Sequence, residues 1–108
     1  MKLLIPLVMF VLFTVGNVAW AADAKAGKAV YDTKCKSCHG AGGEGNAALA
    51  KTLKVEIKPF GSKEIQAKTD DQIKKQITQG GVKMQPVKGL SDTQVQDVIA
   101  FVRSLAKS

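Results

Sequence analysis

The chain has 108 residues, a formal net charge of +7 and only two cysteines, which lie three positions apart. This length allows one small domain, and cysteines so close together cannot cross-link distant parts of a fold. The composition therefore excludes a scaffold held by disulfides and favours a domain that packs around a large apolar cofactor.

The N-terminus has the features of a secretory signal peptide. Lys2 precedes an apolar run from Leu3 to Val15, and Ala19-Trp20-Ala21 places small residues where a signal peptidase reads them. We therefore assign residues 1–21 to a cleaved signal peptide and residues 22–108 to the mature domain. Its 15 basic and nine acidic residues give a formal charge of +6. An uncleaved membrane anchor is the alternative, because the apolar stretch is about long enough to span a bilayer.

The first helix is predicted to begin after Asp23, a capping residue, and to run to about Lys34. The motif Cys35-Lys36-Ser37-Cys38-His39 follows it directly. Two thiols at this spacing reach the two vinyl groups on one edge of a porphyrin, and the next residue points its imidazole at the iron. The motif predicts haem c bonded to Cys35 and Cys38, with His39 as an axial iron ligand.

Three other interpretations of the motif fit the chain less well. A thioredoxin-like dithiol belongs to a βαβ pattern, which this sequence lacks. A zinc site needs four ligands, and the mature chain offers two cysteines and one histidine. A structural disulfide across so short a loop would not call for a histidine beside it.

The middle of the chain alternates between loops and helices. Residues 40–45 are rich in glycine and predict a loop, residues 47–53 predict a short helix, and residues 54–68 show no period and predict a further loop. Thr69-Asp70-Asp71-Gln72 is a capping box that opens a helix. Gly80-Gly81 ends this helix.

Met84 is the candidate for the second axial ligand. His39 is the only histidine of the chain, and Met84 is the only methionine outside the signal peptide. It lies between Gly80-Gly81, which permit a turn, and Pro86, which fixes its own φ. Such a loop can hold a thioether over a flat ring. Alternatively, Met84 fills a gap in the core, as most methionines do.

The last helix opens with a second capping box, Ser91-Asp92-Thr93-Gln94, across which Leu90 and Val95 are placed to form a hydrophobic staple. Its apolar face comprises Val95, Val98, Ile99, Val102 and Leu105, with Phe101 at the margin. We interpret this face as ordinary core. The sequence thus predicts an all-α domain of three long helices and one short helix.

This order of elements resembles that of the class I c-type cytochromes, the small mono-haem proteins of bacteria, over residues 23–107. The resemblance implies their fold, with three main helices and a short one packed around a covalently bound haem. It also implies that Gly27 lets the first and last helices cross closely, with Tyr31 packed against Phe101. One departure is the missing proline whose carbonyl accepts the second ring N–H of the proximal histidine. We expect a backbone carbonyl near residues 46–48 instead.

A histidine and a methionine on one iron predict a role in electron transfer. Both axial positions are filled, so we expect a soluble one-electron carrier that shuttles between larger redox proteins, and not an enzyme. A haem sensor or a peroxidase-like enzyme would need an open iron site. The main alternative is a tethered subunit of a larger oxidase or dehydrogenase. Export predicts a periplasmic location, and we expect a monomer.

Four lysines flank the predicted ligands and predict the kind of partner: Lys34, Lys36, Lys83 and Lys88. If they ring the exposed haem edge, the redox partner has an acidic docking surface. The alternative is a solvated basic surface without a specific role. Export argues against nucleic acid as a partner. We expect membrane contact only through membrane-bound redox partners or an uncleaved signal.

Overall fold

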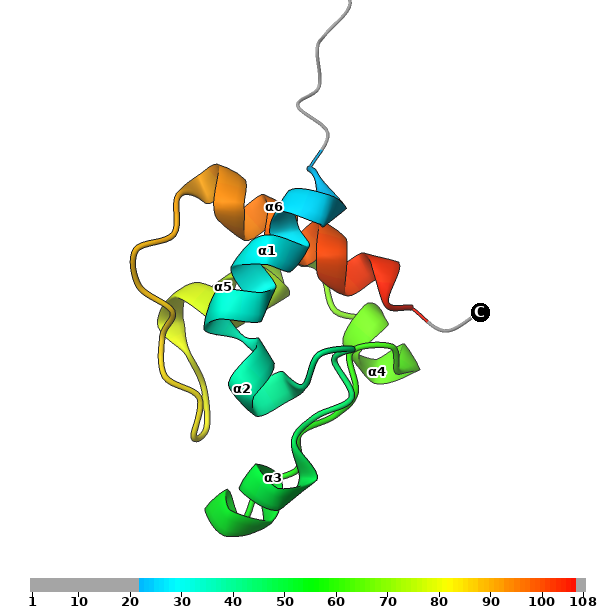
Figure 1. The fold of residues 1–108 in the computed structure, drawn as a ribbon, viewed down its shortest axis with the longest axis vertical. Coiled ribbons are helices and arrows are strands. Elements are labelled where there is room, and N and C mark those ends of the chain that lie inside the picture. Colours follow the sequence, from blue (N-terminus) through cyan, green and yellow to red (C-terminus); the bar gives the residue numbers. More distant parts are fainter. Residues whose placement is uncertain (1–21, 107–108) are drawn as a thin grey trace, which may run out of the picture.

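The computed structural model describes residues 22–106, and within this range the chain is helical without a β-strand (Figure 1). The three longer helices are α1 (Ala24–Lys34), α5 (Asp70–Gln79) and α6 (Asp92–Ser104), and the three shorter ones are α2 (Lys36–His39), α3 (Ala47–Leu53) and α4 (Lys63–Gln66). The predicted all-α class is confirmed. The predicted signal peptide lies outside the described residues. None of the helices within 22–106 is long and apolar enough to cross a bilayer.

The predicted helix starts are present with their caps. The side chain of Asp23 accepts hydrogen bonds from two backbone N–H groups in the first turn of α1. Thr69 and Gln72 form the reciprocal capping box at the start of α5, and Ser91 and Gln94 form the one at the start of α6. Each box satisfies backbone donors that a helix start would otherwise leave without partners. Local sequence therefore sets where the long helices begin.

The predicted short helix over residues 47–53 is present as α3, and the described residues contain two further short helices that were not predicted. α4 lies in the segment 54–68, for which a loop was predicted. Its N-cap is Ser62, whose hydroxyl accepts a hydrogen bond from the N–H of Ile65. α2 is formed by the C-x-x-C-H motif itself. Each spans only four residues, about one helical turn, so neither can show the repeated apolar spacing on which the prediction relied.

α1 and α6 cross at Gly27, as the family resemblance implied. A Cβ atom placed on Gly27 would lie 1.8 Å from the backbone carbonyl oxygen of Asp97 in α6. One turn further along α1, Tyr31 is fully buried, and its ring centroid lies 4.8 Å from that of Phe101. Both residues belong to one cluster of buried side chains, with Cys35. Phe101 is thus part of the core and not at its margin.

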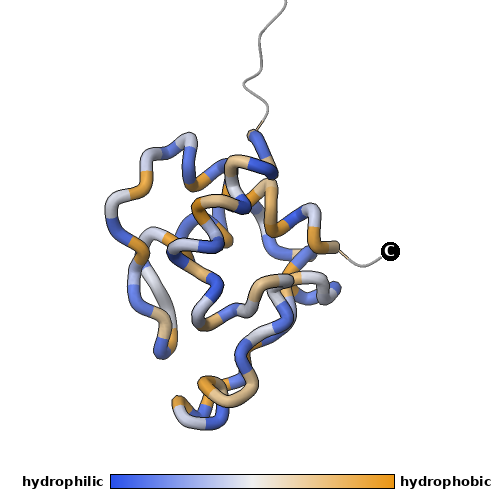
Figure 2. The backbone as a smooth tube through the Cα atoms, in the orientation of Figure 1, coloured by the Kyte–Doolittle hydropathy of each residue, from blue (hydrophilic) through white to orange (hydrophobic). Residues whose placement is uncertain are grey.

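The second part of the core lies between α5 and α6. Figure 2 shows hydrophobic and hydrophilic positions alternating along the chain, as expected for helices that bury one face. Leu90, before the cap of α6, packs against this cluster, in agreement with the predicted staple. The buried members of the cluster are Ile73, Ile77, Val95, Val98, Ile99 and Val102.

Replacing Gly27 with valine should destabilise the fold severely. The added side chain would meet backbone atoms of α6, which cannot move aside as a flexible side chain can. Overpacking typically costs roughly 1–3 kcal/mol, and we expect a loss at or above the top of that range. Thermal melts of the oxidised protein measure it. Ala29→Val, on the exposed side of α1, is the matched control and should cost only the helix propensity of valine, up to about 0.7 kcal/mol. Equal melting temperatures for the two variants would contradict a crossing at Gly27.

Candidate cofactor site

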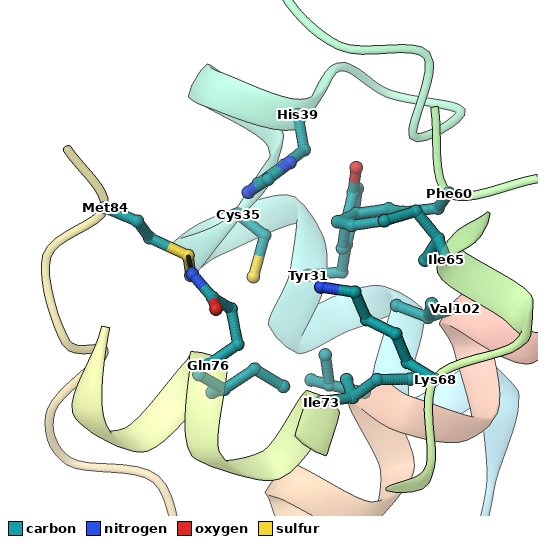
Figure 3. Close-up of a pocket in the computed structure, with 12 residues that line it drawn as sticks. Tyr31, Cys35, His39, Phe60, Ile65, Lys68, Ile73, Gln76, Met84 and Val102 are labelled. Atoms are coloured by element: carbon teal, nitrogen blue, oxygen red, sulfur yellow. Dashed lines mark hydrogen bonds between the residues drawn. The ribbon is translucent and has the colours of Figure 1, made fainter. Parts of the chain in front are cut away.

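A pocket lies beside the α1–α6 crossing, with about 540 Å³ of empty space, part of which is open to solvent. α5 and α6 form one side of the pocket, and the segment around α4 contributes to another (Figure 3). Most of its lining is apolar: Phe60, Ile65, Ile73, Ile77, Val98 and Val102. Such walls suit a large flat apolar group.

Three of the four residues predicted from the sequence line this one pocket. Cys35, His39 and Met84 come from the end of α1, from α2 and from the loop before α6. Figure 3 shows the imidazole of His39 and the thioether of Met84 converging from two elements on the same space. Cys38 is not among the lining residues. Cys35 is buried and Cys38 is exposed, and both are free thiols.

The backbone of the motif sets the direction in which His39 points. α1 ends at Cys35, whose φ of −120° breaks the helix, and α2 then restarts with a hydrogen bond from the N–H of His39 to the carbonyl of Cys35, at 3.0 Å. Gly40 ends α2 with a φ of 82°, which favours glycine. The hydroxyl of Tyr31 donates to the carbonyl of Gly40 at 2.5 Å and so ties this corner to α1.

His39 is held by stacking, and its second nitrogen has no partner. The ring lies against Phe60, with centroids 4.6 Å apart and planes inclined by 27°. Its Nδ1 atom is buried, and no acceptor among the described residues reaches it. Burial lowers the pKa of His39 below its ordinary value, which favours the neutral imidazole. Neutral imidazole is the form that ligates iron.

The expected carbonyl acceptor near residues 46–48 is therefore absent from the described site. The reason is that Asn46 caps α3, so its carbonyl accepts the N–H of Ala50 at 2.9 Å and continues the helix. The carbonyl of Ala48 likewise accepts the hydroxyl of Thr52 at 3.0 Å. Figure 1 shows α3 set apart from the other helices. Helix formation directs these carbonyls along α3 and away from His39.

Met84 sits at the end of a tight turn. Gly81 and Met84 exchange two backbone hydrogen bonds of 3.0 and 3.2 Å, and the N–H of Val87 then donates to the carbonyl of Ile77 at 2.8 Å, which ties the loop to α5. The amide of Gln76 donates to Sδ of Met84 at 3.5 Å. The turn and the amide together fix a thioether in the pocket, with its sulfur polarised by a neighbouring donor.

The two thiols lie in different environments. Burial, and then the proximity of Cys38, raise the pKa of Cys35 to about 11, so this thiol stays protonated at neutral pH. Cys38 is exposed. A cofactor bonded to both thiols would have the end of its bonded edge at Cys35 buried in the protein and the end at Cys38 near solvent.

These residues fit haem c. The pocket combines apolar walls for a macrocycle with the free thiol of Cys35, a neutral imidazole and a thioether, and the second free thiol, that of Cys38, lies three residues further along the chain. This donor set is that of iron held between histidine and methionine. No group of three or more His, Cys, Asp or Glu side chains able to hold a bare metal ion occurs in residues 22–106. The donor set therefore suits iron that is already coordinated by a porphyrin ring.

Sequence reasoning did not identify three residues of this pocket. Phe60 lies in a segment without helical period, so only the fold places it on His39. Gln76 was identifiable in principle, because it lies three positions after Ile73 and shares its apolar face. Lys68 precedes the capping box of α5 and carried no sequence signal of a role. All three line the pocket.

Known proteins resemble this chain over most of its length. The family model described as cytochrome c matches residues 24–106. The chain is similar to a cytochrome c6 of Synechocystis sp., with 37% identity over 89% of this chain and 77% of that one. A cytochrome c6 of Picosynechococcus sp. is 35% identical over 100% of this chain and 97% of its own. A solved structure titled KustC0563 c-type cytochrome aligns with a TM-score of 0.65 and 32% identity, over 75% of this chain and 98% of that one.

Proposed function

The chain belongs to the cytochrome c family, and on that premise we propose that Cys35 and Cys38 bond to its haem and that His39 and Met84 ligate the iron. The predicted membership of the class I c-type cytochromes, the covalent haem c and the role as a one-electron carrier are confirmed by the relatives. The convergence of His39 and Met84 on one apolar pocket is the observation that supports the assignment of the ligands.

Each residue has a distinct task in this proposal. Haem c supplies an iron whose ferric and ferrous states differ by the one electron that is carried. His39 donates through the ring nitrogen that is not buried against the protein, and Phe60 fixes the ring plane. The neutral sulfur of Met84 favours ferrous iron, so it raises the reduction potential relative to a second histidine. The donor from Gln76 adds to this effect by drawing electron density from the sulfur.

We propose that the protein is a carrier and not an enzyme. With His39 and Met84 both bound, no axial position remains for a substrate. Met84 is also restrained by its turn and by the tie between Val87 and Ile77, which opposes its displacement. The apolar walls exclude water from the iron. Electron exchange then depends on the exposed rim of the pocket.

The exposed residues that flank the proposed ligands, which we call the rim, have the features of a docking surface. Cys38 is exposed, and so are the four lysines predicted to ring the haem edge: Lys34, Lys36, Lys83 and Lys88. Val82, beside Lys83 at the tip of the turn before Met84, is 87% exposed. An exposed apolar side chain beside an ammonium group suits a redox partner whose surface has acidic groups around an apolar centre. We propose that this rim is where the partner docks.

Reversing charge at this rim should slow electron transfer to the physiological partner. The double variant Lys36→Glu, Lys83→Glu should lower the bimolecular rate several-fold at low salt, because steering by opposite charge is lost. At physiological salt the Debye length is about 8 Å, so the difference from the parent should shrink. Stopped-flow rates across ionic strength provide the measurement.

Lys25→Glu is the matched control for this experiment. Lys25 is exposed at the start of α1, ten residues before Cys35, which places it about 15 Å along the helix from the motif. Its reversal should alter the rate little. Rates that do not depend on salt, or an effect of Lys25→Glu as large as half that of the double variant, would reduce the rim lysines to a solubilising surface.

We further propose that the protein is exported, that it is cleaved after Ala21, and that the mature carrier works in the periplasm. Haem c is attached after translocation, so the motif and the predicted signal peptide support one another. A carrier kept on its uncleaved signal, as a tethered subunit, is the competing proposal. The intact mass of the purified protein decides between them, because a chain that begins at Ala22 with one haem differs in mass from one that retains residues 1–21.

A further inference from the structure

One charged residue is buried within residues 22–106, and it is Asp97 of α6, which is 9% exposed. Buried carboxylates are almost always paired with a cation or with several donors. Among the described residues Asp97 has one donor, the backbone N–H of Asp23, which lies 2.8 Å from its Oδ1 atom. None of the described cationic side chains forms an ion pair with it. A carboxylate can accept about four hydrogen bonds, so Asp97 can take a further donor.

The crossing of α1 and α6 holds this carboxylate against the start of α1. The backbone carbonyl of Asp97 faces Gly27, where no Cβ atom could be accommodated. One turn earlier in α1, the side chain of Asp97 reaches the N–H of Asp23. Asp23 is itself fixed, because its side chain caps the first turn of α1 and its carbonyl accepts the N–H of Gly27 at 2.9 Å. Both carboxylates are therefore held at one helix start.

The proposed cleavage after Ala21 creates a cation at this place. Ala22 then becomes the first residue, and it is exposed. Backbone nitrogens of consecutive residues lie roughly 3–4 Å apart, so the α-amino group of Ala22 is a neighbour of the N–H that Asp97 binds. The ordinary pKa of an α-amino group is about 7.7–8.0, which keeps most of it protonated at neutral pH. A chain that is not cleaved has a neutral peptide N–H at the same position.

The charge of the helix start makes this ammonium group dependent on the carboxylates. The N-terminal end of a helix carries a partial positive charge, so an ammonium group there is unfavourable by itself. Asp97 reverses the sign, because its negative charge is held at the same end of α1. The ammonium group in turn offsets the cost of burying Asp97 and the repulsion between Asp97 and Asp23.

We propose that Asp97 binds the α-ammonium group of Ala22, so that signal cleavage itself strengthens the contact between α1 and α6. The inference rests on the proposed cleavage after Ala21. It assigns Asp97 a role in maturation, since a chain that keeps its signal lacks the cation and a cleaved chain gains it. Cleavage at an earlier residue would place the ammonium group further from Asp97.

Four haem-bearing proteins test the proposal by their thermal midpoints: the parent, a form with Gly-Ser inserted between Ala21 and Ala22, Asp97→Asn, and the combination of both changes. The insertion moves the ammonium group two residues away, whereas asparagine keeps an acceptor for the N–H of Asp23 and removes only the charge. The insertion should lower the midpoint of the parent by a few degrees, as expected for the loss of an ion pair. It should not lower the midpoint of Asp97→Asn.

Asp32→Asn is the matched control. Asp32 lies nine residues after Asp23, about 13 Å along α1, which is beyond the Debye length of about 8 Å at physiological salt. Its variant removes the same charge from the same helix, where it pairs with Lys28. The insertion should therefore lower the midpoint of Asp32→Asn as much as that of the parent.

Ala22→Gln separates the charge of the terminus from its length. An N-terminal glutamine cyclises when its α-amine attacks its side-chain amide and releases ammonia, which leaves a neutral lactam. The cyclised protein should melt at a lower temperature than the uncyclised one, and Asp97→Asn should abolish the difference. Intact mass distinguishes the two forms.

The outcomes also distinguish this proposal from the proposed cleavage. An intact mass of the parent that includes residues 1–21 would overturn both, because Ala22 would then carry no ammonium group. A parent that begins at Ala22 would retain the cleavage proposal. In that protein, equal midpoints of the cyclised and uncyclised forms, or an insertion effect that persists in Asp97→Asn, would overturn the pairing with Asp97 alone.

Discussion

The double variant Cys35→Ala, Cys38→Ala should lack bound haem and should fail to reach the folded state. Without the cofactor, the apolar walls of the pocket face water, and the buried core is too small to offset the conformational entropy of the chain. Cys35 also belongs to the buried cluster with Tyr31 and Phe101, so its truncation adds a packing defect. We expect essentially complete loss of holoprotein.

Intact mass and denaturing electrophoresis with haem staining measure this loss. Each single variant should retain at most one thioether and stain more weakly, with Cys35→Ala the less stable because its side chain is buried. Ser37→Ala is the control within the same motif, since the Ser37 hydroxyl contacts only the Cys38 sulfur, at 4.0 Å. Recovery of the double variant in folded form with a full complement of haem would refute attachment through these cysteines.

Local chemistry explains which parts of the fold were predictable. The capping boxes at Thr69 and Ser91 and the cap at Asp23 each lie within three residues of the groups they satisfy, so the sequence alone locates them. Gly27 was assigned to the helix crossing only through a resemblance, because nothing local to α1 indicates where a second helix passes. The structure supplies the reason, which is the carbonyl of Asp97 at that point.

The ligands that we propose could be chosen from the sequence because the candidates are so few. The mature chain has one histidine and one methionine, so elimination selects the two candidate ligands without any knowledge of the geometry of the site. The surroundings of these ligands were not predictable. Phe60 reaches His39 from a segment without a period, and the carbonyl of Asn46 is taken up by α3. Such contacts depend on how non-adjacent segments pack, which periodicity within a segment does not encode.

Met84→Ala should open the sixth position of the iron. The weak near-infrared band of iron–sulfur bonding should disappear, and carbon monoxide and cyanide should bind readily to the ferrous and ferric forms. Loss of the sulfur also removes its preference for ferrous iron, so the midpoint potential should fall by a sizeable part of the roughly 0.8 V that axial ligands span. The fold should persist, since Met84 is only half-buried and lies outside both core clusters.

Two further variants separate ligation from packing. Met84→His should keep six ligands and exclude carbon monoxide, yet lower the potential, because imidazole is a better donor to ferric iron than a thioether. Val82→Ala changes the same turn at a side chain that is 87% exposed, so its spectrum and potential should equal those of the parent. A methionine that only fills a gap in the core would give the opposite pattern. The near-infrared band would then be missing from the parent as well, Met84→Ala would melt at a lower temperature with unchanged spectrum and potential, and another group would hold the iron.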